Sequence, residues 1–400
     1  MFDRPNNLWS GTPTWADKDA PIITQLPNGP FATDIVVIGA GITGALAASA
    51  LAEAGYDVTI VDQKAPLQGS IRASTALLQY DLDQPLLRLK ESIGCDNAIR
   101  AWQRSRLALE SLHSKIERLQ IDCDMALRPS LSLAGNLLSS QEMDAEILLR
   151  RAAGLYCSKL SATALAAEYG LTRDGAIHCL GNFTADPIKL TRGFLLHAQS
   201  LGAQVIAPIT VQDVQAGEEV IVKTEQFDIS CRYVVYATGY HVEPSLLPTG
   251  SELVATYVMV TRPQPENLWK DDCLIAEASS PYLYLRTTAD GRIMCGGEDE
   301  PWQGKAQCDA LLGKKTAILQ DKLAMMFPAV DAFPETSWCG AFGNSQTGLP
   351  TIGAIPNKPG CFGIFAFGGN GITFAALAAD MITAQIAGIP CADDDLFAYR

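Results

Sequence analysis

The feature that most constrains this chain is a glycine pattern placed between an apolar stretch and a helix of small residues. Gly39, Gly41 and Gly44 have the spacing GxGxxG and directly follow the apolar residues 35–38. In a strand–turn–helix unit the first glycine permits the tight turn, the second lets the backbone approach a pyrophosphate, and the third lets the helix pack closely. The helix N-terminus presents unpaired N–H groups and a partial positive charge to the phosphates. The pattern predicts an adenine dinucleotide site.

The residues around the glycines agree with this prediction. Residues 43–54 are typical of a helix, and a second apolar strand over 57–62 ends at Asp62. A carboxylate about 20 residues after the glycines accepts hydrogen bonds from ribose hydroxyls. We therefore assign Ile42, Thr43, Asp62 and Gln63 to the same site. These residues leave NAD and FAD as alternatives, and a purely structural glycine-rich turn is a third interpretation.

Composition narrows the class of protein. The length and apolar content fit a soluble globular protein of one large or two intergrown domains. A net charge of −14 argues against nucleic acid as the main partner, because phosphate binding relies on clustered Lys and Arg. The 11 cysteines are scattered without metal-ligand spacing, so we expect reduced thiols, no metal and no disulfide framework. We find no membrane-spanning run and no basic-then-apolar leader, and expect a cytoplasmic protein without membrane insertion.

The order of elements beyond residue 62 indicates a chain that leaves the nucleotide domain and returns to it. We expect a helix over 96–119, a strand over 127–135 and helices over 141–153 and 161–168. Asp186 and Pro187 predict the start of a second α-to-β unit. Strands separated by turns over 251–297, with a hairpin at Asp290 and Gly291, predict an antiparallel sheet. A helix over 314–326 precedes a final strand, glycine-rich loop and helix.

Several ordered motifs resemble those of the D-amino-acid oxidase-like FAD oxidoreductases, which include glycine and sarcosine oxidases. The resemblance spans nearly the whole chain. It rests on "DIVVIGAGITG" with Asp62, "DPIKL", "VVYATGY", "YLYLRTTADGRIMCGG", and "GLPTIG" followed by "FGGNGIT", all in the family's order. It implies FAD as the cofactor. It also implies an α/β fold in which a discontinuous Rossmann-type FAD-binding domain adjoins a substrate domain built on an antiparallel β-sheet plus helices.

We expect the FAD-binding domain to comprise 1–90 with an N-terminal arm over 1–30, together with 160–250 and 336–400. The substrate domain then comprises 91–159 and 251–335.

The C-terminal glycine loop supports FAD through its own chemistry. A glycine-rich turn that opens a helix directs backbone N–H groups and the positive end of the helix dipole at one point. Reduced flavin carries negative charge on N1 and C2=O, which such a helix start stabilises. An NAD enzyme has no use for this second site, although a capped strand with a flexible turn would have the same sequence. The residues assigned here are Gly368, Gly369, Asn370, Gly371, Ile372 and Thr373.

The resemblance implies further contacts with FAD. They involve Arg72, Ser74, Thr75, Ala76, Val211, Thr238 and Gly239. Arg72 would meet the pyrophosphate, or else be a solvated loop charge. Family members with covalent flavin use a Cys or His, whereas this chain has Ser345 and Gln346 before "GLPTIG" and no His near Arg72. We therefore expect non-covalent FAD.

The substrate residues are predicted from strand periodicity and from the resemblance. Alternation places Tyr282, Tyr284 and Arg286 on one strand face. Family oxidases use Tyr and Arg from this sheet to hold carboxylates, and a guanidinium suits a carboxylate well; the alternative is a polar face that meets water. His241 is a candidate proton acceptor, and the alternative is an ordinary loop residue. Tyr257 is expected to line the substrate cavity, and the alternative is a side chain that only packs in the protein core.

One departure from the family concerns the carboxylate anchor. Several of its amino-acid oxidases carry an Arg shortly before "GLPTIG", but "WCGAFGNSQTGLP" has none. An amine, or an amino acid bound differently, therefore fits as well as a simple D-amino acid.

These features predict an FAD-dependent enzyme that oxidises the C–N bond of a small amine or amino acid. A hydride passes to flavin N5, and O₂ accepts the electrons to give H₂O₂. The alternative is a dehydrogenase of the same fold that passes electrons to a quinone or partner subunit. An NAD(P)-dependent dehydrogenase and a flavin-carrying subunit without turnover are the other classes. The sequence identifies no protein partner.

Overall fold

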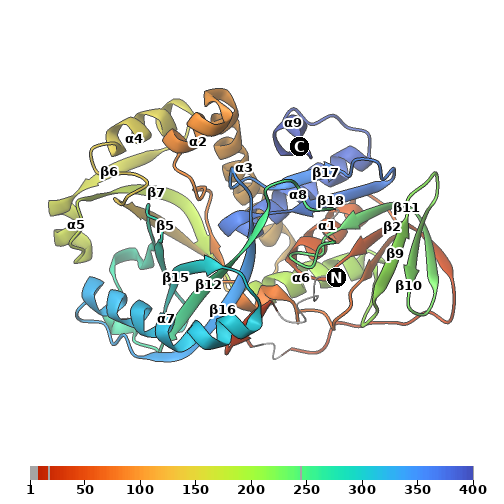
Figure 1. The fold of residues 1–400 in the computed structure, drawn as a ribbon, viewed down its shortest axis with the longest axis horizontal. Helices are drawn as coiled ribbons and strands as arrows, with labels where there is room; N and C mark the ends of the chain where they lie inside the picture. The colour runs from red at the N-terminus through yellow and green to blue at the C-terminus, as the bar shows by residue number, and fades with distance from the viewer. Residues whose placement is uncertain (1–7, 17–18, 244–245, 400) are drawn as a thin grey trace.

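The computed structural model describes residues 8–16, 19–243 and 246–399, which form two β-sheets with helices packed on them. Figure 1 shows the smaller sheet with α1, α6 and α8 in the right half of the molecule, and the larger sheet in the left half and centre. Chain segments cross between the halves several times. The mixed α/β class expected from the sequence is confirmed.

The smaller, eight-stranded sheet has the parallel core of a Rossmann-type domain. Its parallel strands follow the spatial order β18-β11-β2-β3-β8, with β17 antiparallel at the edge beside β18 and the β9–β10 ribbon paired to β11. The strands are β2 (Phe31–Ile38), β3 (Val58–Val61), β8 (Gln204–Ile206), β9 (Val211–Gln215), β10 (Val220–Thr224), β11 (Asp228–Tyr236), β17 (Thr351–Ala354) and β18 (Cys361–Phe365).

Helix α1 (Ile42–Glu53) packs against both α6 (Pro187–Ser200) and α8 (Gly371–Ile386). Small side chains make this contact close, since Ala45, Ala47 and Ala48 are fully buried. Asp186 caps α6 as the sequence predicts, because its carboxylate accepts hydrogen bonds of 2.8 Å and 3.1 Å from the N–H groups of residues 188 and 189. The second α-to-β unit is confirmed.

The larger, ten-stranded sheet is antiparallel except where β13 runs parallel to β5. The predicted hairpin is present at Asp290 and Gly291, and Gly291 has a positive φ of 79°. The strands in spatial order are β1 (Trp9–Gly11), β16 (Pro334–Asn344), β12 (Glu252–Thr261), β15 (Ile293–Pro301), β14 (Leu283–Thr287), β13 (Leu274–Glu277), β5 (Ala126–Leu133), β7 (Gly175–Thr184) and β4 (Leu77–Leu78), with β6 (Cys157–Ser161) paired to β7.

Sheet membership differs from the expected domain boundaries at four strands, one of which is β4 in the expected segment 1–90, where it pairs with β7 of the larger sheet. Of the other three, β1 lies in the predicted N-terminal arm, β7 within 160–250, and most of β16 within 336–400, yet all pair within the larger sheet. Residues 9–11 thus form an edge strand on β16 rather than an irregular arm.

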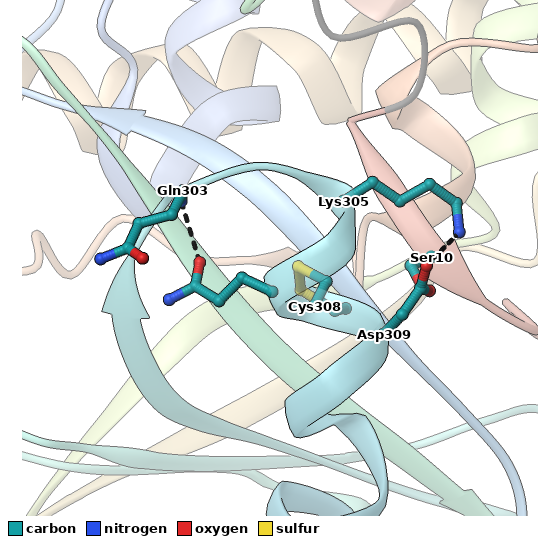
Figure 2. Close-up of a disulfide and its surroundings, with 7 residues drawn as sticks. Ser10, Gln303, Lys305, Cys308 and Asp309 are labelled. Atoms are coloured by element: carbon teal, nitrogen blue, oxygen red, sulfur yellow. Dashed lines mark hydrogen bonds and ion pairs between the residues drawn. A yellow bond between two sulfur atoms is a disulfide. The ribbon is translucent and has the colours of Figure 1, made fainter.

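Helix α7 (Lys305–Met326) packs across β12, β15 and β16. Cys308 on α7 and Cys339 on β16 form a disulfide, which corrects the expectation that all thiols are reduced. The two cysteines are 31 residues apart and meet only because the helix crosses that strand. Beside them the Ser10 hydroxyl donates to Asp309, which ties β1 to α7 (Figure 2).

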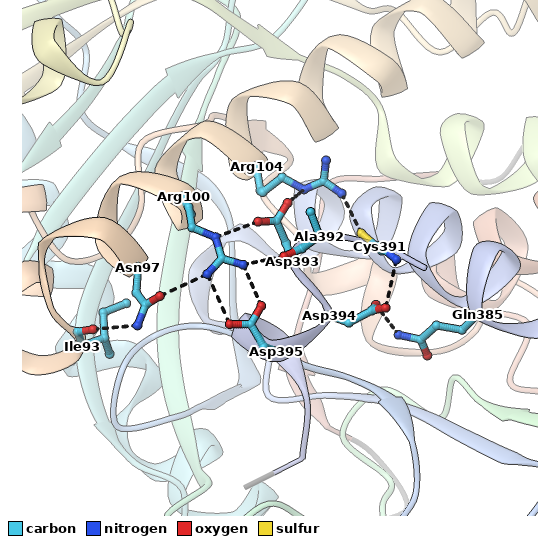
Figure 3. Close-up of polar contacts among 10 residues, drawn as sticks. All are labelled: Ile93, Asn97, Arg100, Arg104, Gln385, Cys391, Ala392, Asp393, Asp394 and Asp395. Atoms are coloured by element: carbon cyan, nitrogen blue, oxygen red, sulfur yellow. Dashed lines mark hydrogen bonds and ion pairs between the residues drawn. The ribbon is translucent and has the colours of Figure 1, made fainter. Parts of the chain in front are cut away.

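The remaining helices are α2 (Leu86–Ile93), α3 (Cys95–Leu119), α4 (Met143–Ala152), α5 (Ala162–Tyr169) and α9 (Asp394–Phe397), with 3₁₀ turns η1 (Ser70–Ala73), η3 (Pro265–Asn267), η4 (Lys270–Asp272) and η5 (Gly368–Asn370). Helix α3 also contacts α8. Arg100 and Arg104 on α3 both contact the Asp393 carboxylate at 2.9 Å, which fixes the segment after α8 (Figure 3). Within the described ranges no helix is long and apolar enough to cross a membrane.

Candidate active site

A cavity of about 1800 Å³ is lined by residues from both sheets. It starts at the carboxyl ends of β2, β3 and β11, where ligands bind in open α/β sheets. It continues past η1 and η5 to β12, β14 and β15. The expected site residues that line it are Gly39, Gly41, Ile42, Thr43, Asp62, Gln63, Ser74, Thr75, Ala76, Val211, Thr238, Gly239, His241, Tyr282, Tyr284, Gly368, Gly369, Asn370, Gly371 and Ile372.

Each of the three glycines of the first loop occupies its position for a different structural reason. Gly39 has a φ of +114°, and a Cβ there would lie 2.4 Å from the carbonyl oxygen of Ala237. A Cβ on Gly44 would lie 1.8 Å from the Gly39 carbonyl oxygen, so the protein itself requires these two glycines. Gly44 does not line the cavity and serves the packing of α1. Gly41 has an ordinary φ of −78°, and a Cβ there would meet nothing within 4 Å. Open space beside Gly41 at the start of α1 is where a pyrophosphate fits.

The Asp62 side chain is held at the end of β3. Its carboxylate accepts hydrogen bonds of 2.7 Å from the Ala40 N–H and 2.8 Å from the Lys64 N–H. Burial raises its pKa, and these two hydrogen bonds oppose that increase. The carboxylate thus lies beside the glycine loop, in position to accept hydrogen bonds from a ribose.

The second glycine loop is fixed by the segment 79–83. Asp83 accepts a 2.8 Å hydrogen bond from the Gly369 N–H, and the Asn370 amide donates 2.8 Å to the Asp81 carbonyl. Thr373 donates to the Gln79 carbonyl at 3.1 Å and does not line the cavity, so its expected contact with FAD is corrected to a structural one. Helix α8 starts at Gly371, one residue before the expected start at Ile372.

The segment 73–76 crosses the cavity wall with each of its carbonyl groups tied down. Trp338 donates to Ala73 at 3.0 Å, and Trp15 donates to Ser74 at 2.6 Å. Arg286 supplies the donors for the other two. This segment therefore lines the cavity with a firmly held backbone.

Arg286 does not face the cavity, which corrects its expected role as a carboxylate anchor. The side chain is 3% exposed, and Nη1 donates to the carbonyl oxygens of Thr75 and Ala76 at 2.8 Å and of Ala185 at 3.0 Å. Burial lowers the pKa of Arg286 to about 9. Strand alternation placed Arg286 on the same face as the tyrosines, but the segment 73–76 covers the strand at that point.

Arg72 and Tyr257 also lie outside the cavity. Nε of Arg72 donates to the Leu67 carbonyl at 3.0 Å, because the η1 turn directs the side chain back along the chain. The Tyr257 side chain is fully buried under α7, with its ring 5.6 Å from the Lys315 ammonium. Its neighbour Thr256 points to the opposite strand face and lines the cavity.

Two tyrosines form a wall at the far end of the cavity. The rings of Tyr282 and Tyr284 are stacked with centroids 5.7 Å apart, and both line the cavity. His241 lines another part of the cavity, in the turn after β11. Its backbone N–H donates a hydrogen bond to the Thr238 carbonyl.

Asp299 is a cavity residue that strand periodicity missed. The pairing of β12 with β15 is irregular between Ala255 and Tyr257, and Glu298 has a positive φ of 60°. Such a bulge re-aims the side chains that follow it. Burial raises the pKa of Asp299 to about 6, while the hydroxyls of Thr256 and Tyr282 oppose this increase. The run "GGEDEP" contains three acidic residues, and Glu298, Asp299 and Glu300 all line the cavity.

Within the described ranges no cluster of His, Cys, Asp and Glu is arranged to hold a metal ion.

Comparisons with known proteins establish the family. The model of the DAO family, described as FAD dependent oxidoreductase, matches residues 34–385, and the chain belongs to this family. FAD is therefore its cofactor, and the geometry at Gly41, Asp62 and the helix starts of α1 and α8 fits that cofactor.

Individual relatives extend over most of the chain. Gamma-glutamylputrescine oxidoreductase of Escherichia coli is 26% identical over 391 residues, covering 93% of this chain and 87% of the relative. Glycine oxidase from Geobacillus kaustophilus superposes with a TM-score of 0.76 at 19% identity, covering 92% of this chain and 98% of that one. L-proline dehydrogenase from P. horikoshii has a TM-score of 0.76 at 17% identity, with 92% and 97% coverage. The two structures confirm the expected fold.

Proposed function

We propose that the protein oxidises the C–N bond of an amine or amino acid to an imine, with O₂ as the electron acceptor and H₂O₂ as the product. The observation that carries the proposal is the continuous cavity that joins the two glycine loops to the Tyr282–Tyr284 wall. The E. coli relative, named for a γ-glutamyl amine, supports the same bond type. FAD supplies the chemistry by accepting a hydride at flavin N5.

The residues of the chain bind and orient the substrate and exclude water from it. The stacked tyrosines form a flat wall against which a carbon chain aligns its reacting C–H bond. The tied segment 73–76 and the loop 368–371 form further parts of the cavity lining. A neutral amine loses a hydride without a dedicated base, so the site has to select and align the neutral form. His241 stays a predicted proton acceptor.

The test is an anaerobic screen of amines and amino acids against the purified holoenzyme, read by loss of flavin absorbance. We expect at least one amine to bleach the flavin and, after air is admitted, stoichiometric peroxide. Bleaching without peroxide would favour the dehydrogenase with a quinone or partner-protein acceptor. Failure of every amine and amino acid to bleach the flavin would reject the proposal. A cytoplasmic location remains a prediction, which fractionation of the producing cells would check.

A further inference from the structure

The tyrosine end of the cavity, defined here as Asp83, Thr256, Tyr282, Tyr284 and Asp299, carries unbalanced negative charge. All five residues line the cavity. Asp83 and Asp299 lie near enough to interact, because the negative charge of Asp83 raises the pKa of Asp299. Burial has the largest effect on the pKa of Tyr282 and raises it. The negative charges of Asp299 and Asp83 raise it further. Two acidic groups therefore share one aromatic-walled space.

The neighbouring cations are occupied by other carboxylates. Lys315 on α7 lines the same cavity, but its ammonium lies 2.7 Å from Glu300 and 3.6 Å from Glu298. Lys322 also pairs with Glu298. Among the described residues, neither Asp83 nor Asp299 forms an ion pair with Lys, Arg or His. Lys315 lowers the pKa of Asp299, but this is the smallest of the effects that act on that carboxyl group.

The guanidinium group of Arg286 is also directed away from the tyrosine end. Arg286, on the same strand as the tyrosines, donates into the backbone of residues 75, 76 and 185. The described part of the tyrosine end thus offers no cation to a substrate carboxylate. An anionic group here would meet two carboxylates and be repelled by both.

The chemistry of this end suits a positive charge. Carboxylates form strong charge-assisted hydrogen bonds with ammonium groups, and the faces of tyrosine rings attract cations. Oδ1 of Asp299 is buried without a hydrogen-bond partner among the described residues, so it has acceptor capacity to offer. Tyr282 adjoins the Asp299 carboxyl, and its ring stacks with that of Tyr284 at a centroid distance of 5.7 Å.

We propose that Asp299 and Asp83 bind a second, non-reacting cationic nitrogen of the substrate, which makes the substrate a diamine or oligoamine rather than a simple amino acid. This inference rests on the proposed function, which it narrows to one class of amine. One nitrogen is oxidised in its neutral form, and the other stays protonated between the carboxylates. The site thereby distinguishes a diamine from a monoamine of equal length and from the matching amino acid.

Binding to oxidised holoenzyme under anaerobic conditions tests the inference by calorimetry. The probes are putrescine, butylamine and γ-aminobutyrate, which share one chain length. We expect putrescine to bind at least about tenfold more tightly than butylamine, and γ-aminobutyrate to bind most weakly. Asp299→Asn and Asp83→Asn, which keep the side-chain shape, should each remove most of the putrescine preference. Asp321→Asn, an exposed position on α7 outside the cavity, should leave it unchanged.

Equal binding of putrescine and butylamine to the wild type would overturn the inference. So would a putrescine preference that survives in both Asp variants. Flavin content and circular dichroism identify a variant that does not fold, in which case the other variant decides. Flavin bleaching is recorded separately: if no amine bleaches the flavin, the proposed function fails, whereas the binding comparison still decides whether the cation site exists.

Discussion

Nη1 of Arg286 donates a hydrogen bond of 2.8 Å to the carbonyl oxygen of Ala76, a residue with a positive φ of 49°. This contact fixes the part of the backbone that passes along the cavity wall. It makes Arg286 a positioning residue for the cofactor segment instead of a ligand for substrate.

Replacing Arg286 with Ala should therefore destabilise the fold and weaken FAD binding together. Three buried carbonyl groups would lose their donor, at a cost on the order of 3 kcal/mol or more in the free energy of unfolding. Denaturant unfolding and the FAD-to-protein ratio measure the two effects. A variant with normal stability and FAD content that selectively loses affinity for carboxylate substrates would contradict this role.

The two glycines of the first loop should respond differently to the same substitution. Gly41→Val should fold but purify without FAD, because its side chain would enter the open space beside α1. Gly44→Val should lower stability by several kcal/mol, about the upper range for a single substitution, because its Cβ would overlap the Gly39 carbonyl. Thermal unfolding of the two apoproteins compares them directly. Full FAD content in Gly41→Val would reject the pyrophosphate assignment.

Local sequence rules predicted the elements whose determinants are local. The glycine turn, the Asp186 cap and the Asp290 hairpin each depend on residues within a few positions, and all three are present. Strand alternation correctly set Tyr282 and Tyr284 on one face. It failed at Arg286 because alternation specifies a face but not what covers that face, and here a segment 210 residues away covers it.

Other features depended on irregularities and long-range contacts. Asp299 reaches the cavity through a bulge that shifts the period of its strand. Cys308 and Cys339 meet only when α7 lies across β16. Neither fact follows from residue spacing, since each requires the packed tertiary structure.

A buried ionic group at the cavity wall gives a stability prediction. Arg150, 3% exposed, contacts Asp81 at 2.5 Å and Glu146 at 2.7 Å, and its guanidinium lies over the Trp102 ring. Arg150→Met would leave two buried carboxylates without their cation, which costs on the order of 3–5 kcal/mol of unfolding free energy. Arg118→Met, which breaks an exposed pair, should cost less than about 1 kcal/mol. Similar losses in urea unfolding for both variants would contradict the prediction.

Diamine binding should depend on pH through Asp299. Its pKa of about 6 means that the carboxylate is neutral below that pH and negative above it, so affinity for a protonated amine rises as the pH increases through 6. The groups facing it are Asp83, Tyr282, Thr256 and, more weakly, Lys315. Putrescine affinity should fall about tenfold for each pH unit below 6, and Asp299→Asn should flatten this dependence. A wild-type affinity that is constant through this range would contradict the assignment.

The cofactor should be released intact by acid. Covalent attachment requires a nucleophilic side chain at the flavin, and the described residues that line the cavity include no cysteine. His241, which does line it, lies in the turn after β11. Precipitation with trichloroacetic acid should therefore leave the yellow colour in the supernatant, with an FAD-to-protein ratio near one. A yellow pellet would show a covalent bond, and an otherwise normal His241→Ala variant with a colourless pellet would then identify the attachment residue.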